Sequence, residues 1–168
     1  MNDSIVIMGV AGCGKSSLGL AVARAEGLLL VEGDDHHSAA SRAKMSCGIA
    51  LTDADRDGWL DRLGHELRAH PHGLVLTCSA LKRIYRERLR AASPGLRFVF
   101  LDIPRDQAQA RVTARAPEHF FSTSLVDSQF ETLEPPTGEP GVLRVDALNP
   151  ISQLQTEVAA WLHAKEPS

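Results

Sequence analysis

An eight-residue segment near the start of the chain has the residue types and spacing of a phosphate-binding loop. It reads Gly9-Val-Ala-Gly-Cys-Gly-Lys-Ser16 and fits the pattern G-x-x-x-x-G-K-S/T. Glycines let the backbone direct several N–H groups into one cavity, where the start of the following helix adds partial positive charge. We expect Lys15 to contact the β- and γ-phosphates of ATP and the Ser16 hydroxyl to bind Mg²⁺. The predicted nucleotide contacts are Gly9, Val10, Ala11, Gly12, Cys13, Gly14, Lys15, Ser16 and Ser17.

Cys13 lies inside this loop, directly before Gly14 and Lys15. A helix N-terminus and a lysine lower the pKa of a nearby thiol and favour its reactive thiolate form. We therefore predict that Cys13 is the most reactive of the three cysteines and that bound ATP protects it from alkylation. The alternative is a side chain that points away from the cavity, into packed helices, and is inert.

A second group of polar residues, Glu32-Gly-Asp-Asp-His-His37, follows the apolar run Leu28–Val31. Ligands of parallel sheets bind at the carboxyl ends of the strands, so Asp34 is expected to face the phosphate loop. A carboxylate there accepts the proton of a substrate hydroxyl or orients Mg²⁺. The alternative is that Asp34 or Asp35 caps the next helix. Asp102, at the end of another apolar run, is a second candidate for the magnesium carboxylate.

Basic residues near other predicted strand ends favour an anionic substrate. Lys44, Arg56, Lys82 and Arg86 are the candidates, with the alternative that any one of them lies on a solvated helix face. His37 and His119 are further candidate substrate contacts, although His119 is equally compatible with packing inside a lid.

Two arginines indicate that the protein has a lid. Arg111 and Arg115 are four residues apart and so share one helix face. Arginines so placed stabilise charge on a transferring phosphoryl group, and a closing lid excludes water from the reaction. We predict that both are catalytic, together with Lys15 and Asp34. The alternative is a solvated helix edge.

The elements that must position these residues alternate between short apolar runs and amphipathic stretches. Such runs are typical of strands buried on both faces of a parallel sheet, which predicts an α/β fold. Residues 32–56 and 117–141 interrupt the alternation and are expected to be irregular binding segments or lids. The expected strands are Ile5–Met8, Leu28–Val31, Leu74–Cys78, Phe98–Leu101 and Val142–Val145, and the first helix is expected over Ser17–Glu26.

The composition is that of one ordinary globular domain spanning residues 1–168, with 43% hydrophobic and 23% charged residues and a net charge of -3. No basic excess indicates nucleic acid or a membrane surface as a partner. The N-terminus lacks the features of a signal peptide, and no apolar stretch is long enough to span a bilayer. Three widely spaced cysteines form no disulfide or zinc pattern, so we expect a cytoplasmic protein.

The phosphate loop alone leaves several classes of nucleotide-binding protein open. A GTPase is disfavoured because no asparagine precedes a lysine, which excludes the Asn-Lys-x-Asp motif that reads guanine. Motor ATPases are usually longer chains. A small-molecule kinase fits best, and a nucleotide switch without turnover is the alternative from a different class.

The chain resembles the gluconate kinase family in several further motifs. Two of these motifs, Cys78-Ser-Ala-Leu-Lys82 and Ser128-Gln-Phe130, are more specific to that family than the phosphate loop. The others are Gly33-Asp34, Lys44-Met45, Gly48, Leu51-Thr-Asp-Ala-Asp-Arg56, Trp59-Leu60, Tyr85-Arg86, His119-Phe-Phe121, Leu125 and Leu133-Glu-Pro135. With the phosphate loop, the resemblance covers residues 5 to about 150.

This resemblance implies a three-layer P-loop kinase fold with five parallel strands in the order 2-3-1-4-5, helices on both faces and a small lid. It also implies a homodimer that transfers the γ-phosphate of ATP to the 6-hydroxyl of D-gluconate. The substrate segment is expected at about 33–60 and the lid at about 115–135. Glu32 and Ser38 differ from the family's usual Asp and Pro, and Pro117-Glu118 replaces its usual small residues. Shikimate or another sugar acid is the alternative substrate.

Overall fold

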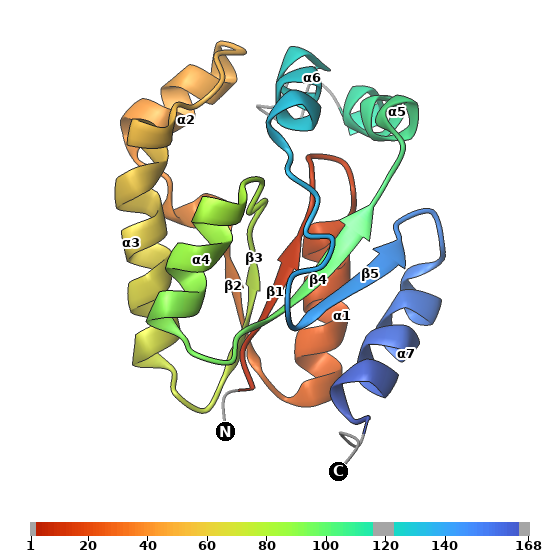
Figure 1. Ribbon diagram of the computed structural model, residues 1–168. Helices are drawn as coiled ribbons and strands as arrows, with labels where there is room; N and C mark the ends of the chain where they lie inside the picture. Colours follow the sequence, from red (N-terminus) through yellow and green to blue (C-terminus); the bar gives the residue numbers. More distant parts are fainter. Residues whose placement is uncertain (1–2, 116–122, 165–168) are drawn as a thin grey trace.

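In the computed structural model, which describes residues 3–115 and 123–164, strands and helices alternate along the chain (Figure 1). The elements are β1 (Ile5–Met8), α1 (Lys15–Glu26), β2 (Leu29–Glu32), the 3₁₀ turn η1 (Gly33–His36), α2 (Ala39–Ser46), α3 (Asp53–Ala69), β3 (Leu74–Thr77), α4 (Arg83–Ala92), β4 (Arg97–Asp102), α5 (Arg105–Arg115), α6 (Thr123–Thr132), β5 (Val142–Asp146) and α7 (Ile151–Leu162). No helix among the described residues has the length and apolar character needed to cross a membrane.

The strands form one parallel sheet in the order β2-β3-β1-β4-β5. Its central strand, β1, places Val6 opposite Leu76 of β3 on one side and Phe98 of β4 on the other. The predicted fold class and strand order are therefore confirmed. All five expected strands are present, with ends that differ by one residue or so, as for β2, which ends at Glu32 rather than Val31.

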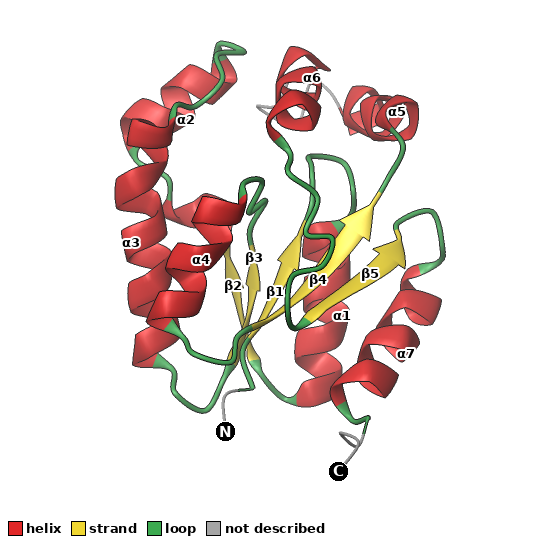
Figure 2. Cartoon of the chain, in the orientation of Figure 1, coloured by secondary structure: helices red, strands yellow, loops and turns green. Residues whose placement is uncertain are grey.

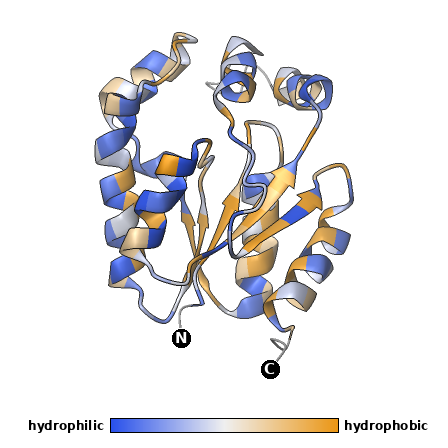
Figure 3. Ribbon diagram, in the orientation of Figure 1, coloured by the Kyte–Doolittle hydropathy of each residue, from blue (hydrophilic) through white to orange (hydrophobic). Residues whose placement is uncertain are grey.

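Alternating side chains of the strands supply two cores, one on each face of the sheet. Ile5 and Ile7 of β1 belong to a core that includes residues of α1 and α7. Val6 and Met8 point the other way, into a core with α3 and α4. The strands are thus apolar on both faces, whereas the helices carry both polar and apolar residues (Figure 3). This arrangement gives the three layers that the sequence predicts.

The two segments expected to be irregular contain helices. Within residues 32–56, Ser38 caps α2 by accepting a hydrogen bond from the Ser41 N–H, and Thr52 caps α3 in a capping box with Asp55. Within 117–141, α6 occupies Thr123–Thr132. The expectation was wrong because both segments are rich in polar residues, so their helices show no clear apolar stripe. The first helix also begins at Lys15 rather than Ser17.

The carboxyl ends of the strands lie at one edge of the sheet, where loops lead into the helices that stand above it (Figure 2). The loop from β1 to α1 lies between α2 and α3 on one side and α5 and α6 on the other (Figure 1). The fold therefore brings the phosphate loop, the segment after β2 and the α5–α6 pair to the same edge.

Candidate active site

The phosphate loop connects β1 to α1 and is shaped by close backbone contacts. Gly12 has a φ of +83°, and a Cβ there would lie 2.8 Å from the carbonyl oxygen of Ala108 on α5. Glycine at this position therefore lets α5 pack directly on the loop. The Lys15 ammonium donates hydrogen bonds to the carbonyls of Gly9 (3.0 Å) and Val10 (3.1 Å), so it lies over the loop that we expect to hold the phosphates.

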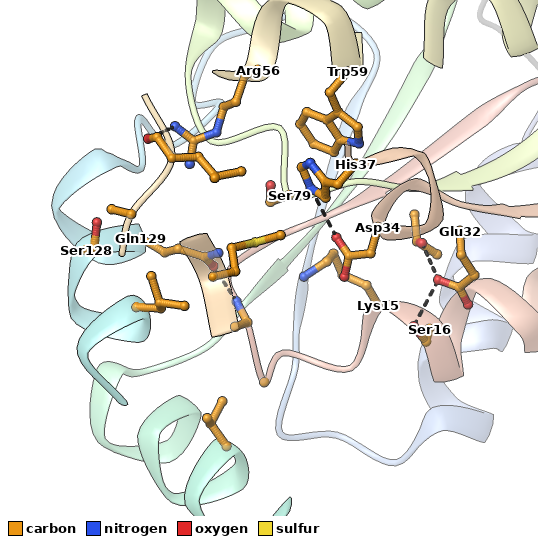
Figure 4. A pocket seen from close by; sticks show the side chains of 18 of the residues that line it. Lys15, Ser16, Glu32, Asp34, His37, Arg56, Trp59, Ser79, Ser128 and Gln129 are labelled. Carbon is orange, nitrogen blue, oxygen red and sulfur yellow. Dashed lines mark hydrogen bonds and ion pairs between the residues drawn. The ribbon is translucent and has the colours of Figure 1, made fainter. Parts of the chain in front are cut away.

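A single pocket brings together the loop and both flanking pairs of helices (Figure 4). Six of the nine predicted nucleotide contacts line it, and Gly9, Val10 and Cys13 do not. Of the predicted substrate contacts, Asp34, His37 and Arg56 line it as well. The lining residues that sequence reasoning did not assign to the site are Glu32, Met45, Ala50, Leu51, Trp59, Thr77, Ser79, Val112, Leu125, Ser128 and Gln129.

Glu32 is the carboxylate next to the Ser16 hydroxyl. Ser16 Oγ donates to Glu32 Oε2 at 3.0 Å, and Thr77 Oγ1 donates to the same oxygen at 2.5 Å. These hard oxygen donors, with Asp34 in the same pocket, fit the preferences of Mg²⁺, which is usually bound by one or two carboxylates and substrate phosphates. The sequence signal for Glu32 was its place at the end of a strand beside the phosphate loop.

Asp102, the other candidate carboxylate, lies elsewhere. It ends β4, accepts a hydrogen bond from Arg144 Nε at 2.7 Å and does not line the pocket. Among the described residues, no group of three or more His, Cys, Asp or Glu side chains is arranged to hold a metal by itself. A magnesium ion here would depend on phosphate oxygens and water for the rest of its coordination.

Asp34 extends into the pocket from η1, where its side chain is 56% exposed. The fold requires glycine just before it, because a Cβ on Gly33 would lie 2.2 Å from the Thr77 carbonyl oxygen. Neither Asp34 nor Asp35 caps α2, since Ser38 does so. The capping alternative is therefore wrong, and the Asp34 carboxylate is left facing the phosphate loop (Figure 4).

His37 and Trp59 form the wall behind Asp34. Their rings stack with centroids 4.3 Å apart, and the indole N–H of Trp59 donates to the Gly33 carbonyl at 2.7 Å. His37 Nε2 lies 3.7 Å from Asp34 Oδ1. Burial lowers the pKa of His37 to about 4 despite the opposing effect of Asp34, so the imidazole is neutral near pH 7.

Arg56 is the predicted basic residue that reaches the pocket. Its Nη1 donates to the Leu51 carbonyl at 2.9 Å and to the Tyr85 hydroxyl at 3.3 Å. The Tyr85 hydroxyl in turn donates to Asp53. Both of these hydrogen bonds use Nη1, and Arg56 lines the pocket, where its guanidinium can bind an anionic group.

The other three basic candidates make ion pairs away from the lining of the pocket. Lys44 pairs with Asp55 at 2.8 Å, and this bond is the main reason that the pKa of Asp55 falls to about 2. Lys82 pairs with Asp53 at 3.0 Å. Arg86 is fully buried, with Nη2 at 2.6 Å from a Glu139 carboxylate oxygen and Nη1 at 2.7 Å from the Ala80 carbonyl.

Arg111 of α5 packs against the phosphate loop. Its Nη1 donates to the carbonyls of Gly12 (3.2 Å) and Cys13 (3.4 Å), and its Nη2 donates to the Ala147 carbonyl at 3.0 Å. It does not line the pocket in this arrangement. The side chain of Arg115 and the whole of His119 lie outside the residues that the structure describes.

Cys13 does not have the surroundings predicted for it. It is 1% exposed, and its Sγ packs so closely on the backbone that a Cβ on Gly9 would lie 2.7 Å away. Burial raises the pKa of the Cys13 thiol and outweighs the nearby charges of Lys15 and Arg111. The expectation of a lowered pKa is therefore wrong, and Cys47 is the exposed cysteine.

A five-stranded parallel sheet in this order, with a phosphate loop after β1 and a carboxylate after β2, defines the protein as a P-loop kinase. A curated gluconokinase from Gluconobacter oxydans is 43% identical over 145 residues, which cover 84% of this chain and 80% of that protein. The thermosensitive gluconokinase of Escherichia coli is 38% identical over 90% of this chain and 83% of that protein. The chain belongs to the gluconokinase family.

The solved structures agree with this assignment. A gluconokinase from Sinorhizobium meliloti has a TM-score of 0.87 and 45% sequence identity, covering 95% of this chain and 90% of that one. No protein-family model matches the chain. The family that the sequence motifs indicated is thus confirmed by whole-chain similarity.

Proposed function

We propose that this enzyme transfers the γ-phosphoryl group of ATP to the 6-hydroxyl of D-gluconate, giving 6-phospho-D-gluconate and ADP. The observation that carries the proposal is that one pocket contains the phosphate loop, the Asp34 carboxylate and the Arg56 guanidinium. These are a site for the donor, a base for the acceptor hydroxyl and a cation for the acid group of the sugar. The names of the relatives support the same substrate.

In the proposed reaction, Asp34 accepts the proton of the 6-hydroxyl while that oxygen bonds to the γ-phosphorus. The bond from phosphorus to the β,γ-bridging oxygen breaks, and ADP leaves. The Lys15 ammonium exchanges the Gly9 and Val10 carbonyls for phosphate oxygens. Neutral His37 and stacked Trp59 form a wall that orients Asp34, and Arg56 binds the gluconate carboxylate.

Ser16 and Glu32 are the residues we propose for Mg²⁺, with Asp34 in support, and Glu32 takes the place of Asp102. The ion supplies positive charge that stabilises the phosphates in the transition state. Arg111, which donates to the Gly12 and Cys13 carbonyls, remains a predicted catalytic residue together with Arg115. His119 remains a predicted substrate contact. Lys44, Lys82 and Arg86 remain predicted substrate contacts that would first have to leave their ion pairs.

We also propose a single kinase domain with a substrate segment at about 33–60 and a lid at about 115–135. A homodimer is proposed from the resemblance to the family, and light scattering coupled to gel filtration tests it. A cytoplasmic location is proposed because ATP and sugar acids are metabolites of that compartment.

The function is tested by ADP release measured with ATP, Mg²⁺ and a panel of acceptors: D-gluconate, other aldonates and shikimate. Gluconate-dependent release with the highest kcat/KM in the panel is expected. Clean release on another acceptor would replace the proposed substrate, and release on none, despite ATP binding, would favour a nucleotide switch.

A further inference from the structure

Helix α6 is attached to the neighbouring helix α5. Asp127 on α6 accepts a hydrogen bond from Gln109 Nε2, and its carboxylate lies 3.5 Å from Arg105 Nε. Leu125 and Val126 are buried, and Leu125 lines the pocket. One side of α6 is therefore packed, while another side faces the site of phosphoryl transfer.

A second attachment joins α6 directly to the phosphate loop. The backbone N–H of Ala11 donates to Gln129 Oε1 at 2.7 Å, although the two residues are 118 positions apart. Ala11 is only 8% exposed, and both residues line the pocket. Figure 4 shows the Gln129 carboxamide extending from α6 into the pocket toward the loop.

The chain that leaves α6 is held in a different way, on α4 and on Leu81 just before it. The Glu134 N–H donates to the Leu81 carbonyl at 2.7 Å, and the Arg83 N–H donates to Glu134 Oε1 at 2.8 Å. Arg86 Nη2 donates to the Glu134 carbonyl at 2.8 Å. The chain after α6 is thus fixed at residue 134, and α6 itself is held on α5 by Asp127. The hydrogen bond of Gln129 is a direct link between α6 and the phosphate loop.

We propose that Gln129 is a positioning residue that couples α6 to the phosphate loop and so aligns the γ-phosphate with the acceptor hydroxyl. This inference rests on the proposed function. Gln129 Oε1 accepts a hydrogen bond from the Ala11 N–H of the loop, while Arg111 donates to the loop carbonyls of Gly12 and Cys13. The loop is therefore held from both sides by the α5–α6 pair.

The chemistry of the side chain suits this position. A carboxamide accepts the Ala11 hydrogen bond without placing negative charge beside the phosphates, which a carboxylate would do. Loss of the bond leaves the Ala11 N–H without this acceptor and removes the direct link between α6 and the loop, so that only the indirect connection through Arg111 of α5 remains. Displacements of about 1 Å in such sites reduce the catalytic rate by up to roughly 10²-fold.

The test compares Gln129→Met, which keeps the length of the side chain but removes the acceptor, with Gln129→Glu, which retains an oxygen acceptor. Hydrogen exchange of the Ala11 amide is measured by NMR without ligands. We expect about fivefold to tenfold faster exchange in Gln129→Met, as for a lost neutral hydrogen bond. In Gln129→Glu, exchange stays within about twofold of the wild type because the acceptor is kept.

Steady-state kinetics with gluconate and ATP complete the test. Gln129→Met is expected to lower kcat about tenfold or more, with little change in the KM for ATP and an unchanged Tm. Gln107→Met is the matched control, because Gln107 is exposed on α5 and its replacement leaves kcat and Ala11 exchange unchanged.

Wild-type exchange at Ala11 in Gln129→Met overturns the proposal, as does a kcat within about twofold of the wild type, because the contact would then be only structural. If the proposed function is wrong, the experiments give a different result. The wild-type enzyme would then not phosphorylate gluconate, the exchange experiment would still test the contact, and kcat would be measured with the acceptor that the panel identifies.

Discussion

The α2–α3 side of the pocket takes its polar groups from one continuous stretch of chain, whereas the α5–α6 side depends on contacts between distant segments. On the first side, Asp34, His37 and Arg56 belong to residues 32–59, and neighbours from the same stretch support them. On the second side, Arg111 and Gln129 reach the phosphate loop across about a hundred residues of sequence. In the proposed function, the first side supplies chemical groups to the sugar, and the second side positions the phosphate loop.

On the α2–α3 side, Asp34→Asn removes the negative charge and the basicity of the Asp34 carboxylate. This substitution has the largest expected effect. We expect kcat to fall by about 10²- to 10⁴-fold, the usual contribution of a general base, with little change in ATP affinity. Steady-state kinetics and an ATP titration measure the two quantities. Asp35→Asn is the matched control, because Asp35 is exposed beside it. Near-normal kcat in Asp34→Asn would remove the distinction between the two sides.

Arg86→Met breaks the attachment of the chain beyond α6. Arg86 and Glu139 are a buried pair with side-chain exposures of 0% and 4%, and loss of one partner costs about 3 kcal/mol of unfolding free energy. Urea unfolding measures this loss, and the nearby exposed Arg83→Met is the control. An unchanged stability with a raised KM for gluconate would instead support the predicted role of Arg86 in substrate binding.

The same pair predicts a pH dependence. Burial acts to raise the pKa of Glu139, but hydrogen bonds from Arg86 and Arg90 together lower it below its usual value. A lowered pKa in the folded state means that the pair stabilises the fold above the unfolded pKa of about 4.3, and that this contribution is lost as the pH falls further. The stability difference between wild type and Arg86→Met should therefore shrink on acidification. A difference independent of pH from neutrality to about pH 3 would contradict this assignment.

Arg56→Lys tests the α2–α3 side of the pocket with a substitution that has a smaller expected effect. A lysine keeps the charge but cannot bond to Leu51 and Tyr85 and also present two N–H groups to a carboxylate. We expect the KM for gluconate to rise about tenfold, with the KM for ATP unchanged. Arg68→Lys, an exposed position on the same helix, is the control. A rise in the KM for ATP alone would indicate that Arg56 binds the nucleotide instead of gluconate.

Limited alkylation has the smallest expected effect on activity. Cys47 is exposed, whereas burial raises the pKa of the Cys13 thiol and raises that of Cys78 to about 12. Mass spectrometry should find Cys47 modified first, with and without Mg²⁺ and ATP, and Cys47→Ser should abolish the early labelling. Early labelling of Cys13 with protection by ATP would restore the original prediction.

The sequence predicted what depends on local pattern. The five apolar runs, the phosphate loop and the position of Asp34 after β2 are all properties of short segments, and the structure places them as expected. Helix α2 was not predicted because its residues are mostly small or polar and form no apolar stripe. The surroundings of Arg86 could not be predicted, because its partner Glu139 is 53 residues away. The orientation of Cys13 depends on packing against Gly9, which its charged neighbours do not reveal.

The stacked rings of Trp59 and His37 also give the pocket an optical signal. Protonated imidazole quenches indole fluorescence more strongly than neutral imidazole, and the pKa of His37 is lowered to about 4. The emission of Trp59 should therefore stay bright at neutral pH and fall as the solution is acidified through that value. The chain has two tryptophans, so a Trp161→Phe background isolates this emission. If a bound sugar acid shifts the stacked pair, its binding would change the wavelength or intensity of the Trp59 emission. Binding could then be measured without turnover or a coupled enzyme.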